Sequence, residues 1–404
     1  MEDPIRASLD HCVKCTICET ACPVAQVTPL FPGPKYEGPQ AERFRQPGGS
    51  VDHSVDYCSG CGICSQVCPQ GVKIAELNSR ARAQLKAERG APWRDRVLAR
   101  PGVTGPMGAP VAPLANKVMA SAPLRRLLER TAGIHRDAPV PPYARQSFQR
   151  WARGRPERGA TDGRRSVVYF HGCSTNWFEP GLGRMVVAVL ERNGVEVALP
   201  SQGCCGLPLQ SNGLFDPARR TLLRLAADLG AAGGQDAVVA SSTSCGLMLK
   251  REGREILGIE DGGLRAMGER TFDICEYLLD LHDQGALDTG FRPLPMTVLY
   301  HAPCQQRGHL MGTPALDLLA LIPELRVVES VGGCCGIAGT YGLKKEKYPI
   351  AMAVGEPLFE QVRQVGPDAV ACDGETCRWQ ISAAAQRPSV HPVELLFRAY
   401  GLDG

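Results

Sequence analysis

Eight cysteines near the start of the chain fall into two runs with the same spacing. Both runs read C-x2-C-x2-C-x3-C-P; their cysteines are Cys12, Cys15, Cys18 and Cys22 in the first and Cys58, Cys61, Cys64 and Cys68 in the second. Two-residue gaps let one tight loop wrap three corners of a cube, and the proline then turns the chain away. This spacing is typical of 4Fe-4S cluster binding.

In such runs the fourth cysteine ligates the other cluster. We therefore expect two crossed ligand sets: Cys12, Cys15, Cys18 and Cys68 for cluster A, and Cys58, Cys61, Cys64 and Cys22 for cluster B. Zinc is the alternative metal, but zinc sites of this kind use two C-x2-C pairs separated by a long gap. Neither run has that form, so the spacing favours ferredoxin-like clusters.

A second group of cysteines occurs twice in the rest of the chain, with an offset of about 130 residues. The members are Cys173, Cys204, Cys205 and Cys245 in the first copy and Cys304, Cys334, Cys335 and Cys377 in the second. The offset indicates an internal duplication. A vicinal disulfide or two core thiols would also explain one adjacent pair. Its recurrence with flanking cysteines, in a reducing compartment, favours a metal site instead.

Four other residues lie close to this pattern. Cys372, five residues before Cys377, is a candidate extra ligand of the second site. Cys275 aligns with an apolar residue in the other copy, so we interpret it as a buried small side chain. His171 and His301 each precede a cysteine-bearing loop, which leaves two hypotheses: proton delivery, or a hydrogen-bonded scaffold role.

Alternating apolar strands and helices must position these cysteines. In the first copy, residues 166–170, 195–200 and 236–241 have strand patterns, and residues 181–194 and 216–233 have helical patterns between them. This order predicts a small parallel sheet flanked by helices, with ligands beyond the carboxyl ends of the strands. The three cysteine loops follow the three strands, so their thiols should converge.

The first half has a different composition. Residues 71–90 predict a helix that Gly90 ends, with an apolar stripe of Ile74, Leu77, Ala81 and Leu85. Residues 100–113 and 137–165 read as connectors rich in proline and glycine.

Between the connectors lies a basic amphipathic segment. Its face of Leu124, Leu127 and Leu128 is surrounded by Arg125, Arg126 and Arg130. Contact with an anionic membrane and packing on a neighbouring helix are both open.

Bulk properties narrow the function classes. The 404 residues include 45 basic and 42 acidic side chains, a formal charge of +3 that argues against nucleic-acid binding. The first residues form no apolar leader, and no stretch reaches the 18 or more apolar residues of a membrane span, so we expect the cytosol. The expected domains are 1–98, a linker at 99–165, 166–290 and 291–404.

The chain resembles the iron–sulfur subunits related to heterodisulfide reductase, including the C subunits of anaerobic glycerol-3-phosphate dehydrogenase. The motifs are CVKCTICETACPV, FPGPK, YHAPC, CCGIAGTYGLKKEKYP and ETCRWQI. The resemblance implies an α+β and α/β fold, in which an N-terminal helical two-cluster ferredoxin-like domain precedes two duplicated α/β domains with small parallel sheets, called CCG domains after their adjacent cysteines.

In that family the iron–sulfur chain passes electrons from a flavin-bearing dehydrogenase to the quinone pool, at the cytoplasmic face of the cell membrane. The resemblance therefore implies two 4Fe-4S clusters, one or two further clusters in the CCG domains, quinone as acceptor, a flavoprotein partner and peripheral membrane contact. A catalytic chain like that of heterodisulfide reductase and an iron–sulfur chain of a glycolate or lactate oxidase complex are the alternatives. No complete G-x-G-x-x-G occurs, so the organic oxidation belongs to another chain.

Two departures from the family pattern affect the chemistry. Full CCG domains carry C-x-x-C, whereas Ser242 stands three residues before Cys245 and Gly374 three before Cys377. Four thiolates suffice for a conventional 4Fe-4S site, so these departures favour electron transfer over disulfide cleavage. Nearby cations help to hold anionic clusters; the candidates are Lys14, Lys344, Lys345 and Lys347, although KKEK also fits a solvated face.

Overall fold

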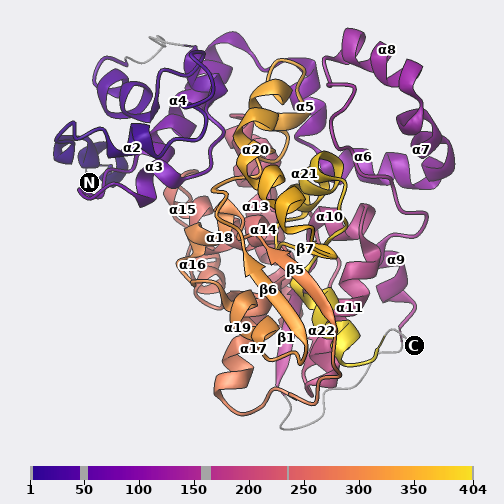
Figure 1. Ribbon diagram of the computed structural model, residues 1–404. Helices are drawn as coiled ribbons and strands as arrows, with labels where there is room; N and C mark the ends of the chain where they lie inside the picture. Colours follow the sequence, from indigo (N-terminus) through magenta and orange to yellow (C-terminus); the bar gives the residue numbers. More distant parts are fainter. Residues whose placement is uncertain (1–2, 46–52, 156–164, 234–235, 403–404) are drawn as a thin grey trace.

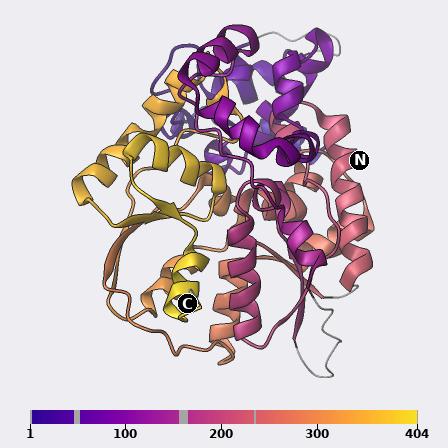
Figure 2. The same ribbon diagram turned by 90° about the vertical axis from the view of Figure 1, so that its right-hand side faces the viewer.

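The computed structural model describes residues 3–45, 53–155, 165–233 and 236–402. Two α/β units lie side by side, and a mostly helical N-terminal unit covers one end of both (Figures 1 and 2). The fold class expected from the sequence is confirmed: a two-cluster ferredoxin-like region precedes two small parallel sheets of four strands each.

The N-terminal unit consists of short helical turns around one longer helix. Its elements are α1 (Pro4–Ala7), η1 (Ser8–His11), α2 (Ile17–Thr20), η2 (Tyr36–Gln40), η3 (Ser54–Tyr57), α3 (Ile63–Gln66) and α4 (Ile74–Arg89). Helix α4 confirms the predicted helix: its stripe is buried, and Gly90 follows it with φ 77°. The short turns leave most of the backbone free to bend around the cysteines.

The connector expected at 100–113 is helical instead. This region contains α5 (Trp93–Leu98), α6 (Pro101–Gly108), η4 (Ala109–Val111), α7 (Ala112–Ala120), α8 (Ala122–Ala132) and α9 (Phe148–Arg153). Pro101 begins α6, where a missing N–H costs nothing. Side chains at Gly105 and Gly108 would overlap Trp177 and Tyr143, so the glycines permit close packing rather than a flexible link. Residues 156–164 of the second expected connector lie outside the described residues.

The first α/β unit carries the sheet β2–β1–β3–β4, all parallel. Its strands are β1 (Ser166–Phe170), β2 (Glu196–Ala198), β3 (Ala237–Ala240) and β4 (Thr271–Asp273). Its helical elements are α10 (Gly172–Trp177), α11 (Pro180–Arg192), α12 (Leu207–Ser211), α13 (Phe215–Gly233), α14 (Thr243–Leu247), η5 (Met248–Glu252), α15 (Gly253–Glu255), α16 (Gly262–Glu269) and α17 (Ile274–Asp283). The first three strands were predicted, whereas β4 was not.

The second unit repeats this topology as β6–β5–β7–β8, again all parallel. Its strands are β5 (Met296–Tyr300), β6 (Leu325–Glu329), β7 (Ala369–Ala371) and β8 (Ser389–Val390). Its helical elements are α18 (Cys304–His309), α19 (Pro314–Ala320), η6 (Tyr341–Leu343), α20 (Tyr348–Val365), α21 (Glu375–Ala385) and α22 (Pro392–Ala399). In both units the order is second, first, third, fourth, so the duplication seen in the sequence is also one of topology.

One apolar core joins the two units. Buried side chains of α11 and α17 in the first unit share a single cluster with those of α19 and α22 in the second. Leu190 and Leu396, for example, are almost completely buried within it. The units therefore pack as one body, which fixes the relative positions of their cysteine loops.

Candidate iron–sulfur sites

The structure brings together the four cysteines of the first N-terminal set. Cys12, Cys15, Cys18 and Cys68 line one small hollow together with Lys14 and Lys35. Lys14 and Thr16 adopt left-handed backbone angles, φ 60° and 68°, which bend the loop around this hollow. Cys15 is exposed, so this set lies at the molecular surface.

The second N-terminal set is deeper. The Cys22 and Cys58 thiols lie close enough for their charges to interact, and Cys64 faces Cys58, Cys61 and Cys22. Burial raises the pKa of Cys22 to about 11 and that of Cys61 to about 12. Such thiols are protonated near neutral pH, so a bound cation must displace their protons. Sulfur donors in an apolar pocket fit an iron–sulfur cluster.

In the first CCG unit the three predicted loops converge at the carboxyl ends of the strands. Cys205 and Cys245 Sγ atoms lie 3.4 Å apart, and Cys204 contacts both Cys173 and Cys205. Gly206 follows the pair with φ 85°, close to the Ala218 carbonyl oxygen. A side chain there would be strained, which explains the glycine after the adjacent cysteines.

The second CCG unit has the same arrangement and one thiol more. Cys335 and Cys377 Sγ atoms are 2.9 Å apart, Cys304 contacts Cys334, and the fully buried Cys372 lies beside Cys377. The second unit thus brings five thiols together. In the first unit Ser242, the counterpart of Gly374, caps α14: its hydroxyl accepts from the Cys245 N–H at 3.4 Å.

The first cysteine of each adjacent pair has a lowered pKa. Hydrogen bonds from Cys173 and Cys205 lower the pKa of Cys204, and hydrogen bonds from Cys304 and Cys335 lower that of Cys334. Each of these two sulfurs also accepts a backbone N–H two residues later in the chain, at 3.4 and 3.3 Å. The two sites therefore match in electrostatics as well as in topology.

The second N-terminal set borders the second CCG site. The pKa of Cys61 is raised first by burial and then by the nearby Cys334 charge, and Cys304 also lies near Cys61. Cys22 and Cys334 belong to one buried cluster with Tyr341. Of the four cysteine sets, the second N-terminal set and the second CCG set therefore lie next to each other.

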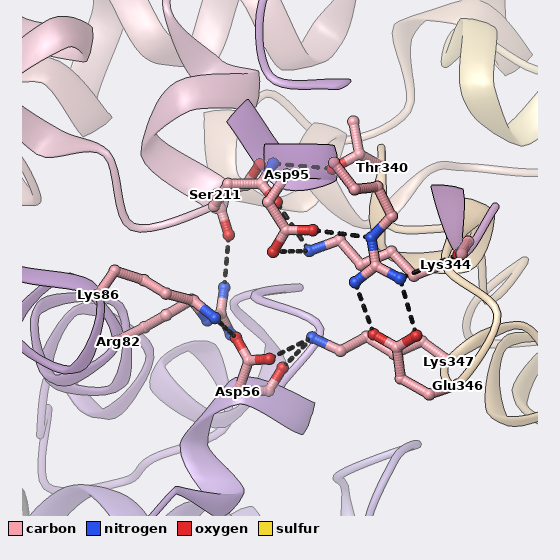
Figure 3. A network of polar contacts seen from close by, with 12 residues as sticks. Asp56, Arg82, Lys86, Asp95, Ser211, Thr340, Lys344, Glu346 and Lys347 are labelled. Atoms are coloured by element: carbon pink, nitrogen blue, oxygen red, sulfur yellow. Dashed lines mark hydrogen bonds and ion pairs between the residues drawn. The ribbon is translucent and has the colours of Figure 1, made fainter. Parts of the chain in front are cut away.

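A polar network holds this junction together, and two of the predicted lysines lie in it (Figure 3). The Lys347 ammonium donates to the Asp56 carbonyl and to its carboxylate, 3.0 Å away, two residues before Cys58. Lys344 donates to Asp95 at 2.9 Å and to Asn212 at 2.8 Å. Both lysines are buried, so KKEK is not simply a solvated face; of its lysines only Lys345 is exposed.

Further ion pairs extend the network to the other units. Arg94 contacts Glu346 at 2.9 and 2.8 Å, and Lys86 contacts the Asp56 carboxylate at 2.9 Å. Arg82 of α4 donates to the Ser211 carbonyl oxygen at 2.8 Å (Figure 3). The N-terminal unit, the connector and both CCG units therefore meet in one network. Sequence spacing gave no signal for it, because its members are distant in the chain.

The two predicted histidines, His171 and His301, are buried, and the Nε2 atom of each has no hydrogen-bond partner among the described residues. His171 Nδ1 lies 2.7 Å from the Gly172 carbonyl oxygen, and His301 Nδ1 lies 3.0 Å from the Ser330 hydroxyl. Burial lowers the pKa of both rings to about 4, so both are neutral near pH 7. Cys275 is completely buried, as expected, and its thiol lies close to Asp273 and Asp373.

The basic helix α8 presents part of its apolar face to solvent. Leu124 is 42% exposed and Leu127 is 55% exposed. The Arg125 guanidinium is occupied by the carbonyl oxygens of Arg136 and Ala138, whereas Arg126 is exposed. Leu128, the third leucine of the face, is half-buried, and α8 packs against α7, so the face is partly covered and partly open to solvent.

Comparison with known proteins decides the family. A 4Fe-4S dicluster domain matches residues 8–72, and a cysteine-rich domain matches residues 167–250 and 298–382. The C subunit of the anaerobic glycerol-3-phosphate dehydrogenase of Escherichia coli (strain K12) is 39% identical over 97% of this chain and 98% of its own length. The chain belongs to this family of C subunits. The two domain matches support iron–sulfur clusters as its cofactors. Because the Escherichia coli relative is one subunit of a larger enzyme, the similarity also implies partner chains.

Other members of the wider group are similar over part of the chain. The B subunit of the fumarate reductase (CoM/CoB) of Methanothermobacter marburgensis is 31% identical over 59% of this chain and 47% of its own length. A lactate utilization protein A from Exiguobacterium is 24% identical over 59% of this chain and 97% of its own length. Among the described residues of this family member, none of the helices has both the length and the apolar character that crossing a membrane requires.

Proposed function

We propose that this chain is the iron–sulfur electron-transfer subunit of a membrane-associated respiratory dehydrogenase of the glycerol-3-phosphate type. The observation that carries the proposal is the proximity of Cys61 to Cys334, because it joins a ferredoxin-type site to a CCG site inside one chain. Iron–sulfur clusters accept and release single electrons, and their potentials follow burial, charge and hydrogen bonding. Neighbouring sites of this kind support the transfer of electrons along the chain better than catalysis at a single site.

We propose the ligands as the sequence predicted them. Cluster A takes Cys12, Cys15, Cys18 and Cys68; cluster B takes Cys58, Cys61, Cys64 and Cys22; the CCG centres take Cys173, Cys204, Cys205 and Cys245, and Cys304, Cys334, Cys335 and Cys377, with Cys372 near the last. The proposed route runs from cluster A at the surface through cluster B and the second CCG centre to the first. Ser174, next to Cys173, donates to Glu375 at 3.2 Å, which supports the last step.

The proposed electron donor is a flavoprotein, and the proposed acceptor is quinone at the cytoplasmic face of the cell membrane. Reduced flavin releases two electrons and two protons; the clusters carry the electrons singly, and quinone takes up two electrons and two protons to form quinol. Helix α6 supports an exit near the first CCG centre, because Gly102 lies against Cys204. The helices that follow α6 carry exposed apolar side chains such as Leu114 and Leu127, which suit contact with lipid.

The test uses the complete complex purified anaerobically with its partner chains. Glycerol 3-phosphate should reduce the clusters and then a soluble quinone analogue, whereas lactate and glycolate should not. Reduction by lactate or glycolate alone would assign the chain to the related oxidase complexes. Quinone reduction that persists at the full rate after this chain is removed would overturn the relay role.

A disulfide-reducing centre is a second candidate, and the extra thiol of the second CCG unit favours it. Cys372 lies beside Cys377, which gives this site one thiol more than a conventional cubane needs. A non-cubane signal in electron paramagnetic resonance (EPR) after treatment with thiols would support this candidate. Its absence, with cubane signals from the CCG half, would support conventional electron transfer.

A further inference from the structure

We propose that His301 is an iron ligand of the second CCG centre, and this inference rests on the proposed function. His301 follows β5 at the edge of the sheet where the cysteine loops converge. Its imidazole is close to two thiols: the ligand atoms of His301, Cys335 and Cys377 all lie within 4.8 Å of one another. Three donors at such a separation are suited to sharing one metal atom.

The backbone and side chain of His301 are both fixed in this position. Its N–H donates to the Ala371 carbonyl oxygen at 2.9 Å, which joins the ends of β5 and β7. On the ring, Nδ1 lies 3.0 Å from the Ser330 hydroxyl. When Nδ1–H donates to that hydroxyl, Nε2 carries the free lone pair that a metal requires.

The other ring nitrogen of His301, Nε2, makes no hydrogen bond within the described residues. The residue is only 1% exposed, so this nitrogen is buried. A buried polar atom without a partner is unfavourable unless it binds something. Gly374 stands where a full CCG pattern has a cysteine, so no thiol is available at that position. His301 supplies a donor next to Cys335 and Cys377.

Other nearby histidines do not have this combination of features. His309 is also buried, but its Nε2 lies 2.7 Å from the Thr243 carbonyl oxygen and is therefore occupied. His171 matches His301 in the repeat, yet no comparable group of one imidazole and two thiols forms around it among the described residues. The inferred ligation is thus specific to the second copy.

A nitrogen ligand changes the redox behaviour of the centre. A full CCG pattern would supply a thiolate at position 374; a neutral imidazole that takes its place carries one negative charge less, and such an exchange raises the potential of iron–sulfur clusters, as in Rieske centres. A higher potential suits a centre that draws electrons from cluster B toward quinone. Binding of neutral Nε2 also releases no proton, whereas each thiol ligand must lose one.

The test needs no variant in its first step. Full-length protein is prepared with ¹⁵N-histidine and with natural histidine, and the two samples are compared by pulsed EPR after reduction. We expect a directly bonded nitrogen coupling that changes with the label. A full iron complement without a histidine-dependent coupling would overturn the inference while leaving the proposed function intact.

The second step assigns the nitrogen. In His301→Cys the coupling of this centre should disappear and its midpoint potential should fall, whereas His309→Gln, the matched buried control, should preserve both. An unchanged coupling or potential in His301→Cys would overturn the inference. If the wild-type chain contains only the iron of the two ferredoxin-type clusters, the proposed CCG centres are absent and the inference fails with them.

Discussion

Cys275 and Cys377 have nearly the same burial but different surroundings. Cys377 lies against Cys335 and Cys372, whereas Cys275 lies next to two carboxyl groups in the apolar core between the units. We predict that Cys377→Ser loses up to about four irons per chain, because the second CCG centre loses a ligand. Cys275→Ser should keep the full iron content. Equal iron losses in the two variants, measured by metal analysis, would contradict the assignment.

Glu252 provides a pH prediction at the level of one residue. One of its carboxylate oxygens is buried without a partner among the described residues, and burial, followed by the charges of Glu76 and Glu255, raises its pKa from 4.5 to about 8. Between those pH values the unfolded chain loses the proton that the folded chain keeps. The stability of the fold should therefore fall as pH rises from about 4.5, and the loss is complete above pH 8.

The substitution Glu252→Gln removes this loss of fold stability at higher pH. We expect its unfolding temperature to exceed the wild-type value progressively between pH 5 and 8, with a gain in the free energy of unfolding on the order of 4 kcal/mol at pH 8. Glu260→Gln is the control, because Glu260 is exposed and is not among the charges that raise the pKa of Glu252. A constant difference between Glu252→Gln and wild type over this pH range would show that Glu252 titrates normally.

The cysteine sets were largely predictable from sequence, because loop spacing alone brings consecutive thiols around one centre. The proximity of Cys61 to Cys334 and the position of His301 between two thiols were not. Both depend on how the units pack. Lys344 and Lys347 show the same limit: a lysine-rich tetrapeptide suggests solvent, and only the tertiary partners Asp95 and Asp56 explain its burial.

At the level of elements, local rules succeeded where the pattern was long and failed where it was short. Helix α4 has an apolar stripe of four residues and ends at a glycine, and the sequence predicts both features correctly. Strands β4 and β8 contain only three and two residues, too few for a recognisable alternation. Helix α6 was missed because proline and glycine usually break helices, whereas here glycine allows close packing on Trp177.

Helices α7 and α8 carry exposed apolar side chains, which suit contact with a partner outside the chain. We predict that replacing both Leu124 and Leu127 by serine weakens binding to vesicles of anionic lipid at least several-fold, because their exposed apolar face no longer inserts. Leu223→Ser on α13, which is 38% exposed, is the control and should bind normally. Binding that is unaffected by the double change in a co-sedimentation assay would remove α8 from the membrane contact.

At the level of the whole molecule, the buried network fixes how the loop of Cys58 and Cys61, proposed to hold cluster B, lies relative to the second CCG site. Lys347 binds Asp56, two residues before Cys58, and the Tyr341 hydroxyl donates to the Tyr57 carbonyl oxygen at 3.0 Å. Buried ion pairs are costly to form, so their value here lies in fixing one arrangement of the units. Electron tunnelling slows steeply with distance, which makes this arrangement important for the relay.

We predict that Lys347→Met weakens the magnetic interaction between reduced cluster B and the second CCG centre and slows reduction of that centre at least tenfold. Lys345→Met changes the exposed neighbour and should match wild type. Both variants should keep their iron. EPR of partly reduced samples and rapid-mixing kinetics provide the readouts, and wild-type behaviour of Lys347→Met would show that the network does not control the junction.

The central claim, that four cysteine sets of one chain hold iron–sulfur centres that interact, is tested most directly by metal and sulfide analysis combined with EPR of the anaerobically purified chain. We predict a brown protein with clearly more than the roughly eight irons of two 4Fe-4S clusters, matching sulfide, negligible zinc and magnetically interacting signals. A colourless protein with near-stoichiometric zinc and no sulfide would contradict it.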